Sequence, residues 1–96
     1  MKKMTEENLK SAFAGESQAH LKYLAFAEKA QQENLPNVAR LFKANSFAEQ
    51  VHAVNHLKTL SGVGKTADNL AAAVGGETFE FEEMYDAYKA VAERQN

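Results

Sequence analysis

Glu49 and His52 are the side chains best suited to chemistry, because they place a carboxylate and an imidazole three residues apart in a predicted helix. At that spacing both side chains leave the same face of the helix, one turn apart, and can point at one ion. The pair also occupies the stripe that should face the core, between Phe42 and His56. A buried charge without a partner costs several kcal/mol, so this pair needs a counter-charge or a metal.

Matching carboxylates occur on the other predicted helices. Glu16 lies in the apolar stripe of the first helix, where a leucine would normally stand, and Glu77 and Glu80 lie near the start of a third helix. Carboxylate oxygens with one or two imidazoles suit iron or manganese, and carboxylates can bridge two ions. Bundles that donate a Glu from two helices and Glu-x-x-His from two others hold di-iron centres. The predicted metal ligands are Glu16, Glu49, His52, Glu77 and Glu80.

Simpler interpretations apply to these residues when each is taken alone. Glu49 and His52 by themselves are more commonly a surface pair, or a core histidine satisfied by a carboxylate. A zinc site made of Glu49, His52 and His56 is a further alternative. His20 and His56 receive no assigned role and are interpreted as residues at the rim. The simple interpretation is disfavoured for the whole set, because it would leave five ionisable residues unpaired in the core.

The composition excludes several classes of protein. The chain is 45% hydrophobic and 25% charged with a net charge of −2, which is ordinary for a soluble domain and not basic enough for nucleic acid. We expect no membrane partner and a cytoplasmic location, because neither a membrane-length apolar run nor a signal-peptide core is evident. The absence of cysteine excludes disulfides, thiolate metal sites and iron–sulfur clusters.

The periodicity predicts an all-α chain that begins with two long helices. Thr5 is a plausible N-cap for the first, which should end near residues 32–34 because Pro36 disfavours helical geometry at the residue before it. A second helix should run from just after Pro36 to about Leu60. The short connection makes the two helices an antiparallel hairpin.

A loop and a third helix should follow the hairpin. The glycines of Ser61-Gly62-Val63-Gly64-Lys65 mark the loop. A short helical piece over 67–74 should stop at Gly75-Gly76, and a long helix should begin near Glu77. Its pattern is still periodic at Val91, so a bundle of this kind needs a fourth helix that the chain does not provide. We expect one domain over residues 1–96, with a hinge loop at about 61–66.

The sequence resembles the rubrerythrin family of the ferritin-like superfamily. The resemblance extends from Thr5 to the C-terminus, and three segments carry it: Ala12-Phe13-Ala14-Gly15-Glu16-Ser17-Gln18-Ala19-His20-Leu21-Lys22-Tyr23, Glu49-Gln50-Val51-His52, and Gly76-Glu77-Thr78-Phe79-Glu80 with Glu83-Met84-Tyr85. It implies a ferritin-like helical bundle built from an antiparallel hairpin and a third helix. The family's fourth helix, which carries a second Glu-x-x-His, is expected to be missing.

The resemblance also implies a role for each predicted ligand. Glu16 corresponds to a terminal ligand of the first iron, and Glu49 to a carboxylate that bridges both irons. His52 corresponds to the imidazole that binds the first iron in the reduced state, and Glu80 to the carboxylate that replaces it on oxidation. Glu77 corresponds to a ligand of the second iron. The implied cofactor is a carboxylate-bridged di-iron centre, with manganese or zinc as substitutes.

The resemblance also implies roles for two tyrosines and a reaction for the site. Tyr23 and Tyr85 correspond to residues that hydrogen-bond the ligand carboxylates, and with Glu80 they form the implied catalytic set. The implied function is a non-haem di-iron peroxidase that reduces hydrogen peroxide to water, with electrons from a separate rubredoxin-like protein. Two alternatives stay open: an iron-oxidation or storage module with a metal site shared between chains, and a metal-poor structural fragment.

The missing half of the site leads to an expectation about partners. Two chains that pair their first hairpins would supply two copies of Glu16 and two of Glu49-x-x-His52, which is a symmetric set. The loop at Ser61 to Lys65 also allows the third helix to be exchanged between chains, as the resemblance implies. We therefore expect a homodimer or a higher even oligomer. The remaining alternative is that the fourth helix has been lost from a longer parent.

Overall fold

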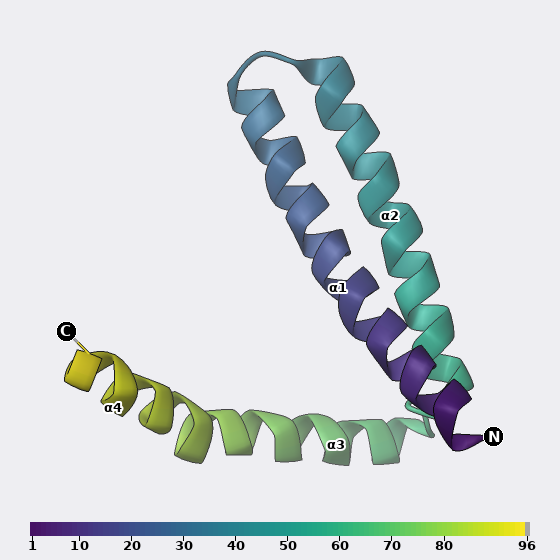
Figure 1. The fold of residues 1–96 in the computed structure, drawn as a ribbon, viewed down its shortest axis with the longest axis vertical. Helices are drawn as coiled ribbons and strands as arrows, with labels where there is room; N and C mark the ends of the chain where they lie inside the picture. The colour runs from purple at the N-terminus through teal and green to yellow at the C-terminus, as the bar shows by residue number, and fades with distance from the viewer. Residues whose placement is uncertain (96) are drawn as a thin grey trace. The chain divides into compact units, whose positions relative to one another are not determined.

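The protein is described by a computed structural model that covers residues 1–95, and all of its regular structure in that range is helical (Figure 1). The helices are α1 (Lys3–Gln32), α2 (Pro36–Thr59), α3 (Thr66–Phe79), the π-helix η1 (Glu80–Met84) and α4 (Tyr85–Gln95). The chain divides into two compact units, Met1–Gly62 and Val63–Asn96, and each is described by itself. Within residues 1–95, no helix combines the length and the apolar character that a membrane crossing requires.

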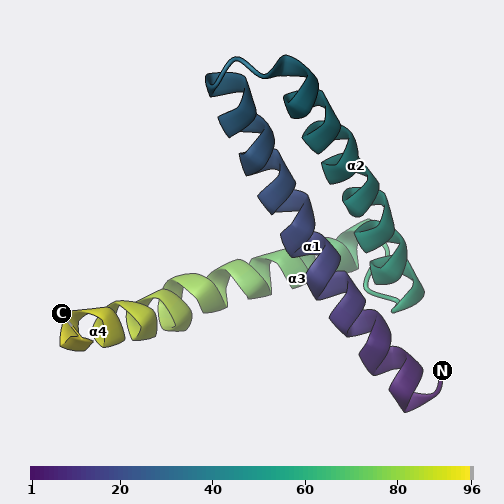
Figure 2. The same ribbon diagram turned by 45° about the horizontal axis from the view of Figure 1, so that its top comes forward.

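The first unit is the predicted antiparallel hairpin of α1 and α2, which lie side by side in both views (Figures 1 and 2). Its turn is closed by Asn34, whose φ of 59° lies in the left-handed region. The Asn34 N–H donates to the Gln31 carbonyl, and the Leu35 N–H donates to the Ala30 carbonyl. This is a Schellman ending, in which the left-handed residue satisfies the last carbonyls of the helix. Pro36 then occupies the first turn of α2, where a missing N–H costs nothing.

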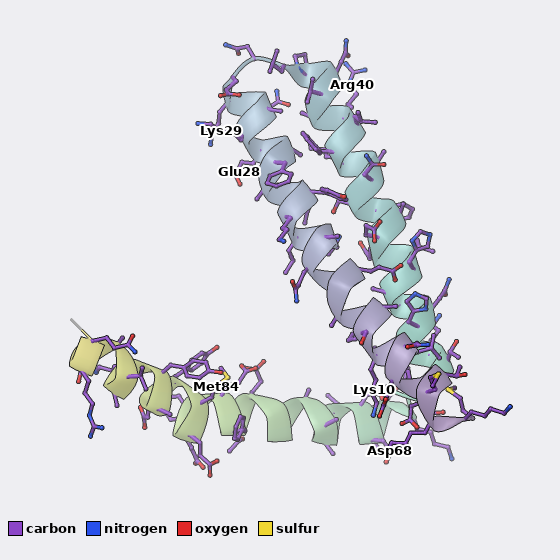
Figure 3. All side chains as sticks on the ribbon, in the orientation of Figure 1. Lys10, Glu28, Lys29, Arg40, Asp68 and Met84 are labelled. Atoms are coloured by element: carbon purple, nitrogen blue, oxygen red, sulfur yellow. The ribbon has the colours of Figure 1, made fainter. Side chains whose placement is uncertain are left out.

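Small side chains line the seam between the two helices. The buried residues of the hairpin are Ala27, Ala30, Ala39, Ser46 and Ala53. Because none of them extends far beyond Cβ, the two backbones can approach closely along this seam. Charged residues such as Glu28 and Lys29 project away from α2 (Figure 3).

Three aromatic rings pack between α1 and α2 near the turn. Phe26 from α1 meets Phe42 from α2 edge-on with centroids 5.5 Å apart, and Tyr23 stacks on Phe42 at 6.1 Å. Aromatic pairs in these arrangements contribute about 0.5–1.5 kcal/mol beyond the area they bury. The cluster therefore fixes the two helices relative to each other on the turn side of the predicted ligands.

The second unit is helical without interruption from Thr66 to Gln95. The predicted break at Gly75-Gly76 is wrong, because α3 continues through both glycines and neither has a positive φ. A glycine in a helix costs about 1 kcal/mol relative to alanine, and the alanines at 71–73 before the pair favour the helix. The predicted cap at Thr5 is also wrong: α1 begins at Lys3, and no side chain caps it.

Candidate metal centre

The hairpin brings three of the five predicted ligands together. Glu16 comes from α1, and Glu49 and His52 come from one face of α2. One donor atom from each of the three lies within 4.8 Å of the donor atoms of the other two. Glu16 and Glu49 are half-buried, while His52 is exposed. The cluster thus has carboxylates on the inside and an imidazole at the open edge.

The two oxygens of Glu16 face two different histidines. Oε1 lies 3.8 Å from His52 Nδ1, and Oε2 lies 2.7 Å from His56 Nε2. Oε2 is shielded from solvent and accepts no hydrogen bond, because the short approach of His56 does not have hydrogen-bond geometry. A buried carboxylate oxygen in this state is costly, by about 1–3 kcal/mol or more for a charged group.

The donor set itself supports a metal at the cluster. A divalent cation at the donors of Glu16, Glu49 and His52 would offset the charge of two half-buried carboxylates that face each other. The donor set is two carboxylates and one imidazole, which suits iron, manganese or zinc and excludes metals that require thiolates. The residues present therefore fit the ion that the sequence predicts.

A reciprocal contact between α1 and α2 holds the two sides of the cluster in register. The Ser46 hydroxyl donates to the His20 carbonyl at 2.8 Å, and His20 Nδ1 lies 2.8 Å from Ser46 Oγ and 3.0 Å from the Ser46 carbonyl. Because the hydroxyl proton is used on the carbonyl, the ring nitrogen acts as donor to Ser46. His20 stands one turn after Glu16, and Ser46 one turn before Glu49. The contact therefore sets the height at which the two carboxylates face each other.

The other two predicted ligands belong to the second unit. Glu77 lies in α3, and Glu80 is the first residue of the π-helix. The Tyr85 N–H donates to the Glu80 carbonyl, five residues back. The Tyr85 hydroxyl donates a second hydrogen bond to Glu80 Oε2, at 3.4 Å. The charge of Glu80 is the main cause that raises the pKa of Tyr85, with burial, this hydrogen bond and the charge of Glu77 adding to it.

Tyr23 lies on the hairpin and packs against the rings of Phe26 and Phe42. Among residues 1–95 its hydroxyl makes no hydrogen bond to a carboxylate, so the contact implied by the family resemblance is not formed there. Tyr85 does contact a carboxylate, that of Glu80. The two tyrosines thus differ in what their hydroxyl groups contact.

Comparison with known proteins identifies the chain. A family model described as Rubrerythrin matches residues 7–96. The chain belongs to the rubrerythrin family. It is similar to Rubrerythrin-2 of Clostridium acetobutylicum, with 39% identity over 96% of this chain and 58% of the relative. It is also similar to Rubrerythrin of Porphyromonas gingivalis (36% identity, 95% and 52%) and to Nigerythrin of Nitratidesulfovibrio vulgaris (32% identity, 95% and 52%). The chain spans a little over half the length of these rubrerythrin relatives.

Sequence reasoning leaves two functional contacts of this rubrerythrin chain unassigned. His56 shares the stripe of Glu49 and His52 but is interpreted as a rim residue, although its spacing of four from His52 puts it on the same face. Ser46 carries no chemical signal, because a serine at a small-residue seam is ordinary. Only the distance to His20 in the folded hairpin shows what its hydroxyl does.

Proposed function

We propose that this chain is the metal-binding part of a rubrerythrin-type peroxidase, which reduces hydrogen peroxide to water. The observation that carries the proposal is the convergence of the donor atoms of Glu16, Glu49 and His52, which lie within 4.8 Å of one another. Membership of the rubrerythrin family supports a pair of iron ions as the cofactor. Manganese or zinc would satisfy the same donors.

The residues divide into three proposed roles. Glu16, Glu49 and His52 are proposed to hold the metal on the hairpin. Glu77 and Glu80 are the proposed carboxylate ligands that the second unit carries. A bound ferrous pair supplies the two electrons that, with two protons, convert one peroxide molecule into two water molecules. Glu80 is the proposed anionic donor for the ferric state, when a hard oxygen suits the higher charge better than the His52 imidazole does.

The tyrosines are proposed to act on the protein side of the reaction. Tyr85 donates to Glu80 and so fixes the orientation of a carboxylate that has to change its ligation. The charge of Glu80 raises the pKa of Tyr85, which favours the protonated phenol that donates this hydrogen bond. Tyr23 is proposed to join this set only when its hydroxyl turns from the aromatic cluster toward a ligand carboxylate.

Completion of the site by a second copy of the chain is part of the proposal. A bundle of this class uses two Glu-x-x-His segments, and Glu49-x-x-His52 is the one segment of that pattern in these 96 residues. A two-fold partner would supply the other, in a homodimer or a higher even oligomer. The hairpin also exposes large apolar side chains such as Leu21, Leu41 and Phe47, as an association surface does.

The electrons are proposed to come from a separate protein. The proposed donor is a small rubredoxin-like protein, which would deliver single electrons at the surface of this protein.

The test combines metal stoichiometry with oxidant preference. The chain is loaded with ferrous iron without oxygen and weighed by native mass spectrometry, with Glu49→Gln as the control. We expect an even assembly that carries iron in pairs, and oxidation by peroxide that is faster than oxidation by dioxygen. Preference for dioxygen with accumulation of ferric mineral would instead indicate an iron-oxidation or storage protein. A metal-free monomer would refute the proposal.

A further inference from the structure

His56 makes a short contact with the buried oxygen of Glu16. Its Nε2 lies 2.7 Å from Glu16 Oε2, whereas the contact of His52 with Glu16 is a longer one of 3.8 Å, to Oε1. Both side chains are largely shielded, at 27% exposure for His56 and 28% for Glu16. The contact is therefore formed in a place where water competes weakly.

The position of His56 distinguishes it from the cluster ligands. His56 follows His52 by four residues, so both imidazoles leave the same face of α2. The donors that lie within 4.8 Å of one another are those of Glu16, Glu49 and His52, and His56 is outside that group. It contacts the far oxygen of Glu16, while the near oxygen faces His52. A metal at the cluster would use one Glu16 oxygen, and His56 the other.

The third histidine of the hairpin cannot take this part. His20 Nδ1 is committed to Ser46 on the seam, at 2.8 Å from its hydroxyl oxygen and 3.0 Å from its carbonyl. His56, in contrast, has a ring nitrogen next to Glu16 Oε2. The final torsion of a histidine side chain is broad, so a rotation of the ring aligns Nε2–H with the oxygen at small cost.

We infer that His56 is a positioning residue, which donates from Nε2 to Glu16 Oε2 and leaves Oε1 free for the metal. This inference rests on the metal site of the proposed function. A hydrogen bond to the outer oxygen fixes the orientation of a ligating carboxylate, and loss of such a partner typically lowers metal affinity by about 10–100-fold. Glu16 would then bind through one oxygen instead of switching between its two.

The test compares two amide side chains that differ in reach, introduced as His56→Gln and His56→Asn. The glutamine can bring its amide nitrogen to the place of Nε2, whereas the asparagine is one methylene too short. Cobalt(II) is the probe, because its visible spectrum reports both binding and geometry. The affinity of His56→Asn should fall by about 10–100-fold, and His56→Gln should recover most of it. Asn55→Ala, at the exposed neighbouring position, should bind like the wild type.

X-ray absorption on the bound cobalt counts its imidazoles and separates positioning from ligation. We expect one imidazole for each cobalt in the wild type and in His56→Gln. Two imidazoles in the wild type and one in His56→Gln would overturn the inference, because His56 would then be a ligand. Equal cobalt affinity of the wild type, His56→Asn and His56→Gln would also overturn the inference. If Glu49→Gln fails to bind cobalt in the same experiment, the proposed metal site would still stand. Failure of the wild type to bind cobalt would overturn both.

Discussion

Replacement of Ser46 by alanine tests whether the contact with His20 holds the hairpin together. Ser46 is 1% exposed, and its hydroxyl forms two contacts at 2.8 Å, one with the His20 carbonyl and one with His20 Nδ1. Each such hydrogen bond contributes about 0.5–1.5 kcal/mol, so their loss costs at most about 1–3 kcal/mol. The cost is lowered because His20 Nδ1 keeps the Ser46 carbonyl, 3.0 Å away, as an acceptor. Alanine is the better helix former by up to about 0.7 kcal/mol, which offsets part of the loss. The expected net loss for Ser46→Ala is about 1–2 kcal/mol.

The measurement is thermal unfolding of the metal-free protein, followed by circular dichroism at one fixed protein concentration. For a domain of this size each kcal/mol lowers Tm by roughly 4–8 °C. Ser11→Ala is the matched control, because Ser11 is an exposed residue of α1 and the substitution changes helix propensity alone. Ser46→Ala should also bind cobalt(II) more weakly, since Ser46 stands one turn before Glu49. A Tm for Ser46→Ala equal to that of Ser11→Ala would refute the reasoning.

Three further outcomes are expected. Glu80→Ala should keep iron on the hairpin but lower peroxide turnover by about 10–100-fold, as stopped-flow kinetics would show; unchanged turnover would contradict the role of Glu80. Glu80→Gln removes the negative charge that mainly raises the pKa of Tyr85, so the phenol should ionise at lower pH in an ultraviolet titration of metal-free protein whose other tyrosines are phenylalanine. Cobalt(II) at 100 times its Kd should stabilise the chain by about 2.7 kcal/mol, and both a chelator and Glu16→Gln should abolish this gain in Tm.

The hairpin and half of the site follow from local signals in the sequence. Pro36 fixes where α2 begins, and Asn34 tolerates the left-handed turn that ends α1. With the two helices antiparallel and their stripes facing, Glu16 has to lie near Glu49 and His52. The expected cluster is therefore a consequence of helical periodicity, which is the strongest signal that a single sequence carries.

The second unit shows where local signals are insufficient. The pair Gly75-Gly76 indicates a break by composition, but the helix costs of two glycines are small enough for the flanking segments to override. The π-helix at Glu80–Met84 has no propensity signature at all. It depends on backbone N–H groups such as that of Tyr85 donating to the carbonyl five residues back instead of four. Residue types do not reveal which of the two bonds forms.

The π-helix at Glu80–Met84 changes which later residues share a helix face with Glu80. In an unbroken α-helix, positions five apart lie about 140° apart around the axis. Here Tyr85 contacts Glu80 through both backbone and side chain. Every later side chain is therefore rotated by about one residue, or about 100°, from its place in an unbroken helix. The face of Glu80 continues through Tyr85 and Tyr88, not through Met84 and Ala87, and alignment of this segment with an unbroken helix requires a one-residue gap.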